Sequence, residues 1–190
     1  MLCGVLSLQG DWQAHGNVLC RLGAEVCMVR TTAELAMVDA LVIPGGESTA
    51  MLRLMGQEQL AGKIEQRITG GMPVLATCAG VILLAREVEP CQQTLSALDI
   101  RVLRNAYGRQ LSSDIVAVDL APEMGEPAQM EGVFIRAPRI TRTGDSVTVL
   151  GRRDNDPVLV RQDRIIAATY HPELTEDTRV HQLFLESVAA

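Results

Sequence analysis

The sequence is poor in several residue types, and each shortage narrows the classes of protein that it can encode. Aromatic residues make up only 3% of the 190 residues, against 47% hydrophobic residues, so aliphatic side chains must fill the core. Lys63 is the only lysine, the net charge is -6, and no basic block occurs, which argues against nucleic acid as a partner. No apolar run is long enough to span a membrane, so we expect a cytoplasmic protein without membrane attachment.

Cysteine is also scarce, and its pattern excludes two common uses. The 5 cysteines are odd in number, irregularly spaced and never arranged as Cys-x-x-Cys, so we expect neither a disulfide framework nor a metal site. Cys3, Cys20 and Cys27 lie in apolar segments and are expected in the core. Cys91 lies in a polar loop.

The first half of the chain alternates short apolar strands with helical segments. Strands are expected over 3–8, 25–29, 40–43 and 74–76, and helices over 11–22, from 48 onward, over 58–68 and over 79–86. Continuous apolar strands that alternate with helices are typical of a parallel sheet covered by helices on both faces.

The second half changes to closely spaced strands. They are expected over 100–104, 113–119, 133–136, 147–150, 158–160 and 165–169, and an amphipathic helix is expected over 177–188. These strands predict antiparallel additions beside the parallel core. The sequence therefore predicts an α/β fold of the flavodoxin-like type, an open mixed sheet within a single domain over 1–190.

Four turns that carry reactive or small residues each follow an apolar strand directly. Ligands bind beyond the carboxyl ends of the strands in an open parallel sheet, so we expect these turns to meet at one edge. The turns are Gln9-Gly10-Asp11, Pro44-Gly45-Gly46-Glu47-Ser48, Thr77-Cys78-Ala79-Gly80 and His171-Pro172-Glu173.

Cys78 is the candidate nucleophile. It stands at the start of an expected helix, whose unpaired N–H groups and positive end favour a thiolate. The alternative is a buried core thiol, which is common for free cysteine. The His171-Pro172-Glu173 turn favours the nucleophile.

His171 and Glu173 supply the base and the group that orients it. Proline disfavours helix at the preceding residue, and in extended chain residues two apart point the same way. Glu173 is therefore expected to fix the tautomer of His171. The alternative is a surface turn with a solvated carboxylate. His15 and His181 lie in helical sequence without such a neighbour and are expected at the surface or an interface.

The Gly45-Gly46 turn is the candidate oxyanion site. A phosphate cradle is the alternative, but the P-loop spacing and its lysine are missing, and Glu47 would repel a phosphate. The N–H groups of Gly46 and Ala79 are instead expected to hold an oxygen that bears developing charge.

These segments together resemble class I, triad-type glutamine amidotransferases and, more narrowly, the glutaminase subunits of pyridoxal 5′-phosphate synthases. The resemblance extends along the whole chain, and Ala76 and Tyr107 replace a usual glycine and phenylalanine. Its most specific stretches are Gly-Gly-Glu-Ser-Thr at 45–49, Arg-Asn-Ala-Tyr-Gly-Arg-Gln at 104–110 and Val-Phe-Ile-Arg-Ala-Pro at 133–138.

The resemblance implies hydrolysis of L-glutamine to glutamate and ammonia through a thioester on Cys78, with His171 as acid and base. It implies no bound cofactor, since pyridoxal phosphate (vitamin B6) is the product of the complex. The substrate-binding positions that it implies are Gly46, Glu47, Ser48, Arg104, Ile135 and Arg136. A guanidinium suits the α-carboxylate of glutamine, although a surface ion pair is the alternative for both arginines.

The resemblance also implies a partner, a (βα)8-barrel synthase subunit that receives the ammonia in a complex of twelve synthase and twelve glutaminase subunits. Two other functions remain open at this point. One is the glutaminase subunit of another amidotransferase, such as imidazole glycerol phosphate synthase. The other is a catalytically silent binding subunit, which the intact Cys78, His171 and Glu173 disfavour. A cysteine hydrolase or chaperone of the flavodoxin-like type would have no use for Arg104 and Arg136.

Overall fold

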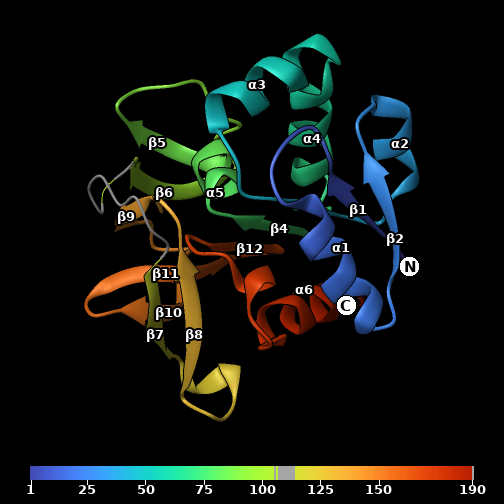
Figure 1. The fold of residues 1–190 in the computed structure, drawn as a ribbon. Coiled ribbons are helices and arrows are strands. Elements are labelled where there is room, and N and C mark those ends of the chain that lie inside the picture. Colours follow the sequence, from blue (N-terminus) through green and yellow to red (C-terminus); the bar gives the residue numbers. More distant parts are fainter. Residues whose placement is uncertain (105, 107–113, 190) are drawn as a thin grey trace.

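The computed structural model describes residues 1–104, 106 and 114–189 (Figure 1). Most of the 104–110 motif, namely Asn105 and residues 107–110, lies outside these described residues. So does Ser113, the first residue of an expected strand.

Nine of the described strands form one mixed sheet in the order β2-β1-β3-β4-β12-β11-β10-β7-β8. The pairs from β2 to β12 are parallel, and those from β12 to β8 are antiparallel. The expected parallel core with added antiparallel strands is therefore confirmed. The bounds are β1 (Leu2–Leu6), β2 (Glu25–Val29), β3 (Ala40–Ile43), β4 (Val74–Thr77), β7 (Asp114–Leu120), β8 (Gln129–Phe134), β10 (Thr148–Arg153), β11 (Asp156–Gln162) and β12 (Ile165–Ala168).

A smaller described sheet has the order β5-β6-β9, with β5 parallel and β9 antiparallel to β6. Its strands are β5 (Ala85–Glu89), β6 (Leu98–Leu103) and β9 (Arg139–Thr143). The helices are α1 (Trp12–Arg21), α2 (Thr32–Met37), α3 (Ser48–Gln57), α4 (Leu60–Thr69), α5 (Ala79–Leu84) and α6 (Arg179–Ala189), with short 3₁₀ turns η1 (Pro122–Met124) and η2 (Pro172–Leu174).

Alternation along the buried strands divides the core between the two faces of the large sheet. In β3, Leu41 and Ile43 pack with α2 to α5 on one face, whereas Ala40 and Val42 pack with α1 and α6 on the other. Figure 1 shows α3 and α4 on one side of β4 and β12, and α6 on the other. Because both faces are covered, all four residues of β3, β4 and β12 are buried.

The structure differs from the sequence-based expectations in several places. The helix expected over 79–86 ends at Leu84, and β5 begins at the next residue. The short elements α2 and β9 were not expected, and Cys20 is exposed rather than in the core. Cys3 is buried as expected, and Cys27 is half-buried. Among the described residues, no helix is long and apolar enough to cross a membrane.

Candidate active site

The four expected turns meet beyond the carboxyl ends of β1, β3, β4 and β12. A Cβ atom on Gly10 would overlap the carbonyl oxygen of Gly45, and one on Gly45 would overlap the imidazole of His171. The side-chain oxygen of Gln9 accepts a hydrogen bond from the N–H of Glu47 at 2.9 Å. These contacts place the nucleophile turn, the double-glycine turn and the histidine at one edge of the sheet.

Cys78 occupies a sharp turn between β4 and α5. Its φ of 46° and ψ of -103° are rare for a residue with a side chain, and its N–H donates to the carbonyl of Ala168 at 2.9 Å. A Cβ atom on Gly80 would overlap the carbonyl oxygen of Ile43, so the turn requires glycine there. The strained turn holds the thiol just beyond the carboxyl end of β4, where Sγ lies 3.9 Å from the carbonyl oxygen of Ile135.

His171 and Glu173 are paired, as expected. The Nδ1 atom of His171 lies 2.7 Å from Oε1 of Glu173, and both residues are buried. The backbone conformation differs from the extended one expected, since Pro172 begins the 3₁₀ turn η2 and brings the carboxylate back to the ring. Because a carboxylate accepts only, Nδ1 carries a hydrogen and Nε2 is the ring atom available for proton transfer.

Charge in this pair is stabilised by mutual contacts rather than by solvent. Burial lowers the pKa of His171, but hydrogen bonds to Cys78 and Glu173 and their negative charge outweigh it and raise the pKa to about 10. Burial raises the pKa of Glu173, but His15 and His171 outweigh it and hold the pKa well below its ordinary value. These contacts therefore favour the imidazolium form of His171 and the carboxylate form of Glu173.

A pocket of about 140 Å³ opens beside the thiol. Besides Cys78 and Ala79, its lining includes all the expected substrate-binding positions, namely Gly46, Glu47, Ser48, Arg104, Ile135 and Arg136. Ile82 of α5 also lines it and was not expected. The structure thus brings together residues that lie up to 90 positions apart in the sequence.

The charged groups of the pocket are held by local contacts. Glu47 caps α3 by accepting hydrogen bonds from the N–H groups of Thr49 and Ala50, and Arg104 Nη2 lies 3.5 Å from Glu47 Oε1. Burial raises the pKa of Glu47, but these hydrogen bonds and Arg104 outweigh it, so the pKa is lowered. Gln92 accepts a hydrogen bond from the Ser48 hydroxyl at 3.1 Å, a contact that no sequence signal predicted.

His15 and His181 are not surface residues, which corrects the expectation. Both are fully buried, and His15 Nδ1 lies 3.0 Å from His181 Nε2. The other ring nitrogen of His15 lies 3.3 Å from Oε2 of Glu173, directly behind the pair just described. Helical spacing was a usable signal, since His15 shares the buried face of α1 with Val18 and Leu19, and His181 shares that of α6 with Phe184.

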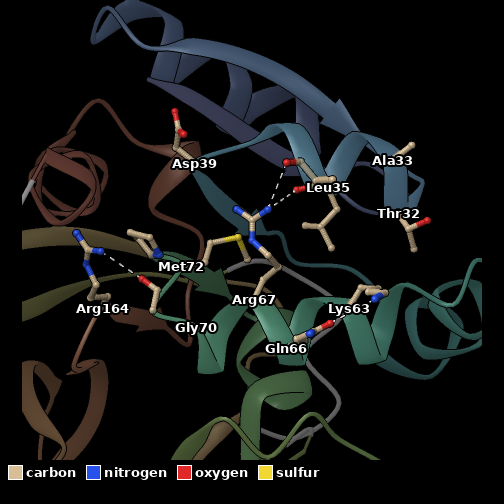
Figure 2. Close-up of a pocket in the computed structure, with 13 residues that line it drawn as sticks. Thr32, Ala33, Leu35, Asp39, Lys63, Gln66, Arg67, Gly70, Met72 and Arg164 are labelled. Carbon is tan, nitrogen blue, oxygen red and sulfur yellow. Dashed lines mark hydrogen bonds between the residues drawn. The ribbon is translucent and has the colours of Figure 1, made fainter.

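A larger cavity of about 790 Å³ lies at the opposite edge, near the amino ends of the strands (Figure 2). Figure 2 shows Arg67 turned toward α2, where it donates to the carbonyl oxygen of Leu35 at 3.1 Å. It also donates to the carbonyl oxygen of Val38, just after α2, at 2.6 Å. Arg164 likewise binds the carbonyl of Ser187 at 2.7 Å. Main-chain carbonyl oxygens therefore occupy both guanidinium groups, which link α4 to α2 and the start of β12 to α6. The cavity itself is remote from the thiol of Cys78.

Comparison with known proteins shows the family to which the chain belongs. The profile of the SNO glutamine amidotransferase family matches residues 5–190. The chain belongs to this family. It is 54% identical over 190 residues to the protein of Koribacter versatilis named pyridoxal 5′-phosphate synthase subunit PdxT, covering 99% of this chain and 96% of that one. The PdxT of Thermotoga maritima is 48% identical over 189 residues, covering 99% and 100%.

Solved structures agree with the family assignment. A crystal structure described as a glutamine amidotransferase matches with a TM-score of 0.90 at 41% identity, covering 99% of each chain. A putative GMP synthase protein from Thermoplasma acidophilum matches with a TM-score of 0.73 at 20% identity, covering 100% of this chain and 94% of that one. At that identity the second likeness concerns the fold alone.

Proposed function

We propose that this chain, acting as a single domain, hydrolyses L-glutamine to L-glutamate and ammonia. The observation that carries the proposal is that Cys78 lines a pocket together with Glu47 and Arg104, while behind it Cys78 contacts His171, which is paired with Glu173. A nucleophile, a base and an orienting carboxylate beside charged groups suit a small zwitterionic amide.

In the proposed mechanism, the Cys78 thiolate attacks the side-chain amide carbon of glutamine. The developing oxyanion receives hydrogen bonds from the N–H groups of Gly46 and Ala79. The His171 imidazolium protonates the departing nitrogen, so ammonia leaves and a thioester remains. His171, now neutral, takes a proton from water, and the hydroxide attacks the thioester to release glutamate and restore the thiolate.

Recognition of the substrate falls to the rest of the pocket. Arg104 and Arg136 are suited to the α-carboxylate of glutamine, and Glu47 is suited to its α-ammonium group. Ser48 and Ile135 line the path between these charges and the thiol. These roles require that glutamine displace or share the contact between Arg104 and Glu47, which is long at 3.5 Å.

The name that the relatives share supports a further part of the proposal. Since those relatives are called subunits of pyridoxal 5′-phosphate synthase, we propose that the ammonia passes to a synthase subunit that makes this compound. The partner is proposed to be a (βα)8 barrel in a complex of twelve plus twelve subunits, working in the cytoplasm. Pyridoxal phosphate is then the product, and the chemistry at Cys78 uses no cofactor.

The test is release of glutamate from glutamine, measured with and without the copurified synthase subunit. We expect release that rises with the partner and that Cys78→Ala abolishes while docking persists. Undiminished release by Cys78→Ala would refute the covalent mechanism. Ammonia incorporated only into an imidazole product, with no dependence on ribose 5-phosphate, would favour the subunit of imidazole glycerol phosphate synthase instead.

A further inference from the structure

A buried chain of side chains continues behind Glu173. The His15 Nε2 atom of α1 lies 3.3 Å from Glu173 Oε2 and 3.1 Å from the hydroxyl oxygen of Thr77, the residue that precedes the nucleophile. On the other side of the same ring, Nδ1 lies 3.0 Å from Nε2 of His181 in α6. All four side chains are buried, so bulk solvent does not reach these contacts.

The second carboxylate oxygen depends on His15. Oε1 of Glu173 is taken by His171, and among the described residues Oε2 has no geometrically ideal hydrogen-bond donor. Nε2 of His15, at 3.3 Å, is the nitrogen that faces it. A buried carboxylate oxygen without a hydrogen-bond donor destabilises the folded protein, so Glu173 needs His15 beside Oε2.

The contacts of the two rings constrain where His15 and His181 carry their hydrogens. If Nε2 of His15 were bare, its lone pair would face both a carboxylate oxygen and the Thr77 oxygen, so this nitrogen carries a hydrogen. His181 is neutral, because burial and the neighbouring His15 lower its pKa to about 3. His15 Nδ1 and His181 Nε2 therefore share one hydrogen bond at 3.0 Å, and the other ring nitrogen of His181, Nδ1, has no partner among the described residues.

We propose that His15 is a positioning residue that holds Oε2 of Glu173 while His171 takes Oε1, and that His181 fixes the tautomer of His15 that makes this contact. The proposal rests on the function proposed above for Cys78, His171 and Glu173. It gives α1 and α6, on the far face from α3 and α4, a direct part in setting the geometry of the triad.

Other titratable groups act on this cluster from each neighbouring element. Arg21 of α1 acts on His181, Tyr170 after β12 interacts with Glu173, and Cys78 acts on His171. Within the described part of the chain none of these three groups donates a hydrogen bond to Oε2, so substitution of His15 isolates the effect on that oxygen. Burial raises the pKa of Glu173 and His15 lowers it, so loss of His15 is expected to raise the pKa of Glu173.

Two variants of the same residue separate positioning from packing. In His15→Gln the amide nitrogen can take the place of Nε2 and donate to Glu173, whereas in His15→Asn the amide reaches only the place of Nδ1. In the glutaminase assay with the synthase subunit present, we expect His15→Asn to lower kcat by about tenfold or more and to leave KM within about twofold of the wild type. We expect His15→Gln to retain most of the wild-type kcat. In the second pair, His181→Gln keeps a hydrogen-bonding group toward His15 and His181→Leu removes it, so only His181→Leu should lower kcat.

The pH profile is the readout that a merely structural role would not move. Since Glu173 must be ionised and its pKa rises in His15→Asn, the acid limb of kcat/KM should move to higher pH, and in His15→Gln it should stay near that of the wild type. Equal losses in both variants with an unmoved acid limb would overturn the proposal. Wild-type kcat in His15→Asn would also overturn it.

A second measurement keeps this proposal distinct from the proposed function. Alkylation of Cys78 by iodoacetamide, followed on the Cys78 peptide because Cys20 and Cys91 are exposed, requires no glutamine turnover. If the wild type released no glutamate, the proposed function would fail, yet a shifted pH dependence of alkylation in His15→Asn alone would still support the positioning role. An identical pH dependence in wild type, His15→Asn and His15→Gln would contradict it.

Discussion

Gly45 and the imidazole of His171 are in such close contact that a Cβ atom at position 45 would overlap Cε1 of the ring. The same Cβ atom would lie 3.3 Å from Cβ of Cys78. The double-glycine turn is therefore packed against both Cys78 and His171, and its first glycine is required for space rather than for an unusual φ angle.

The Gly45→Ala variant should lose activity by displacing His171. A shift of the ring by about 1 Å is enough to reduce kcat by about a hundredfold, so we expect a loss of that order in the glutaminase assay. The matched control is Gly62→Ala in α4, where the added methyl group meets nothing within 4 Å. This control should keep full activity and gain stability by about 0.5–1 kcal/mol in urea unfolding, since alanine favours helix. Full activity in Gly45→Ala would contradict the packing described here.

The strained backbone of Cys78 gives a prediction about stability. Its φ of 46° is accessible to glycine at little cost, whereas for a residue with a Cβ atom it costs about 1 kcal/mol or more. Both Cys78→Ala and Cys78→Gly should be inactive, but Cys78→Gly should unfold at the higher urea concentration. The opposite order would mean that the turn stores no strain.

Sequence reasoning reached most of the fold because β1 to β4 are short, apolar and separated by clear turn signals. It failed where an apolar run fits two structures: residues 79–86 were expected as one helix, yet the chain passes into β5 at Ala85. The short α2 also escaped, although the capping box of Thr31 and Glu34 was a usable signal.

The residues that line the candidate active site were predicted more completely than the buried residues that contact them from behind. Turns that follow strands reveal Cys78, Gly46 and His171, because topology alone brings them to one edge. His15 escaped because it lies 166 residues from His181 and 62 residues from Thr77, and Gln92 escaped because it lies 44 residues from Ser48. Only tertiary packing brings such pairs together, and no local pattern encodes it.

Arg104 is expected to bind substrate rather than to take part in chemistry. Arg104→Gln removes a charged hydrogen-bond donor from the pocket and should raise KM for glutamine by about tenfold or more, with a smaller change in kcat. Arg101→Gln, in β6 just before Arg104, removes a guanidinium that pairs with Glu87 outside the pocket and should leave KM unchanged. Equal effects of the two substitutions would mean that Arg104 acts only through surface charge.

The alkaline limit of activity should depend on Glu173. The pKa of His171 is raised from 6.5 to about 10, so the proton is held more tightly in the folded state. The resulting stabilisation of the fold is complete below pH 6.5 and is lost as the pH rises through about 10.

Glu173→Gln removes one cause of that shift, so the pKa of His171 should fall and the alkaline limb of kcat should move to lower pH. The value of kcat itself should drop by about a hundredfold or more, because the amide no longer stabilises the imidazolium. Rate profiles and urea unfolding across pH 6 to 10 measure both effects. An alkaline limb that stays in place would contradict the contact between His171 and Glu173.

The central claim is that Cys78 forms a thioester with the glutamyl group. Its most direct test is mass spectrometry of the wild type, mixed with L-glutamine in the presence of the synthase subunit, then quenched in acid during turnover. We predict the added mass of one glutamyl group on the Cys78 peptide, which is absent from Cys78→Ala. Steady release of glutamate with Cys78 unmodified at every time point would contradict the account.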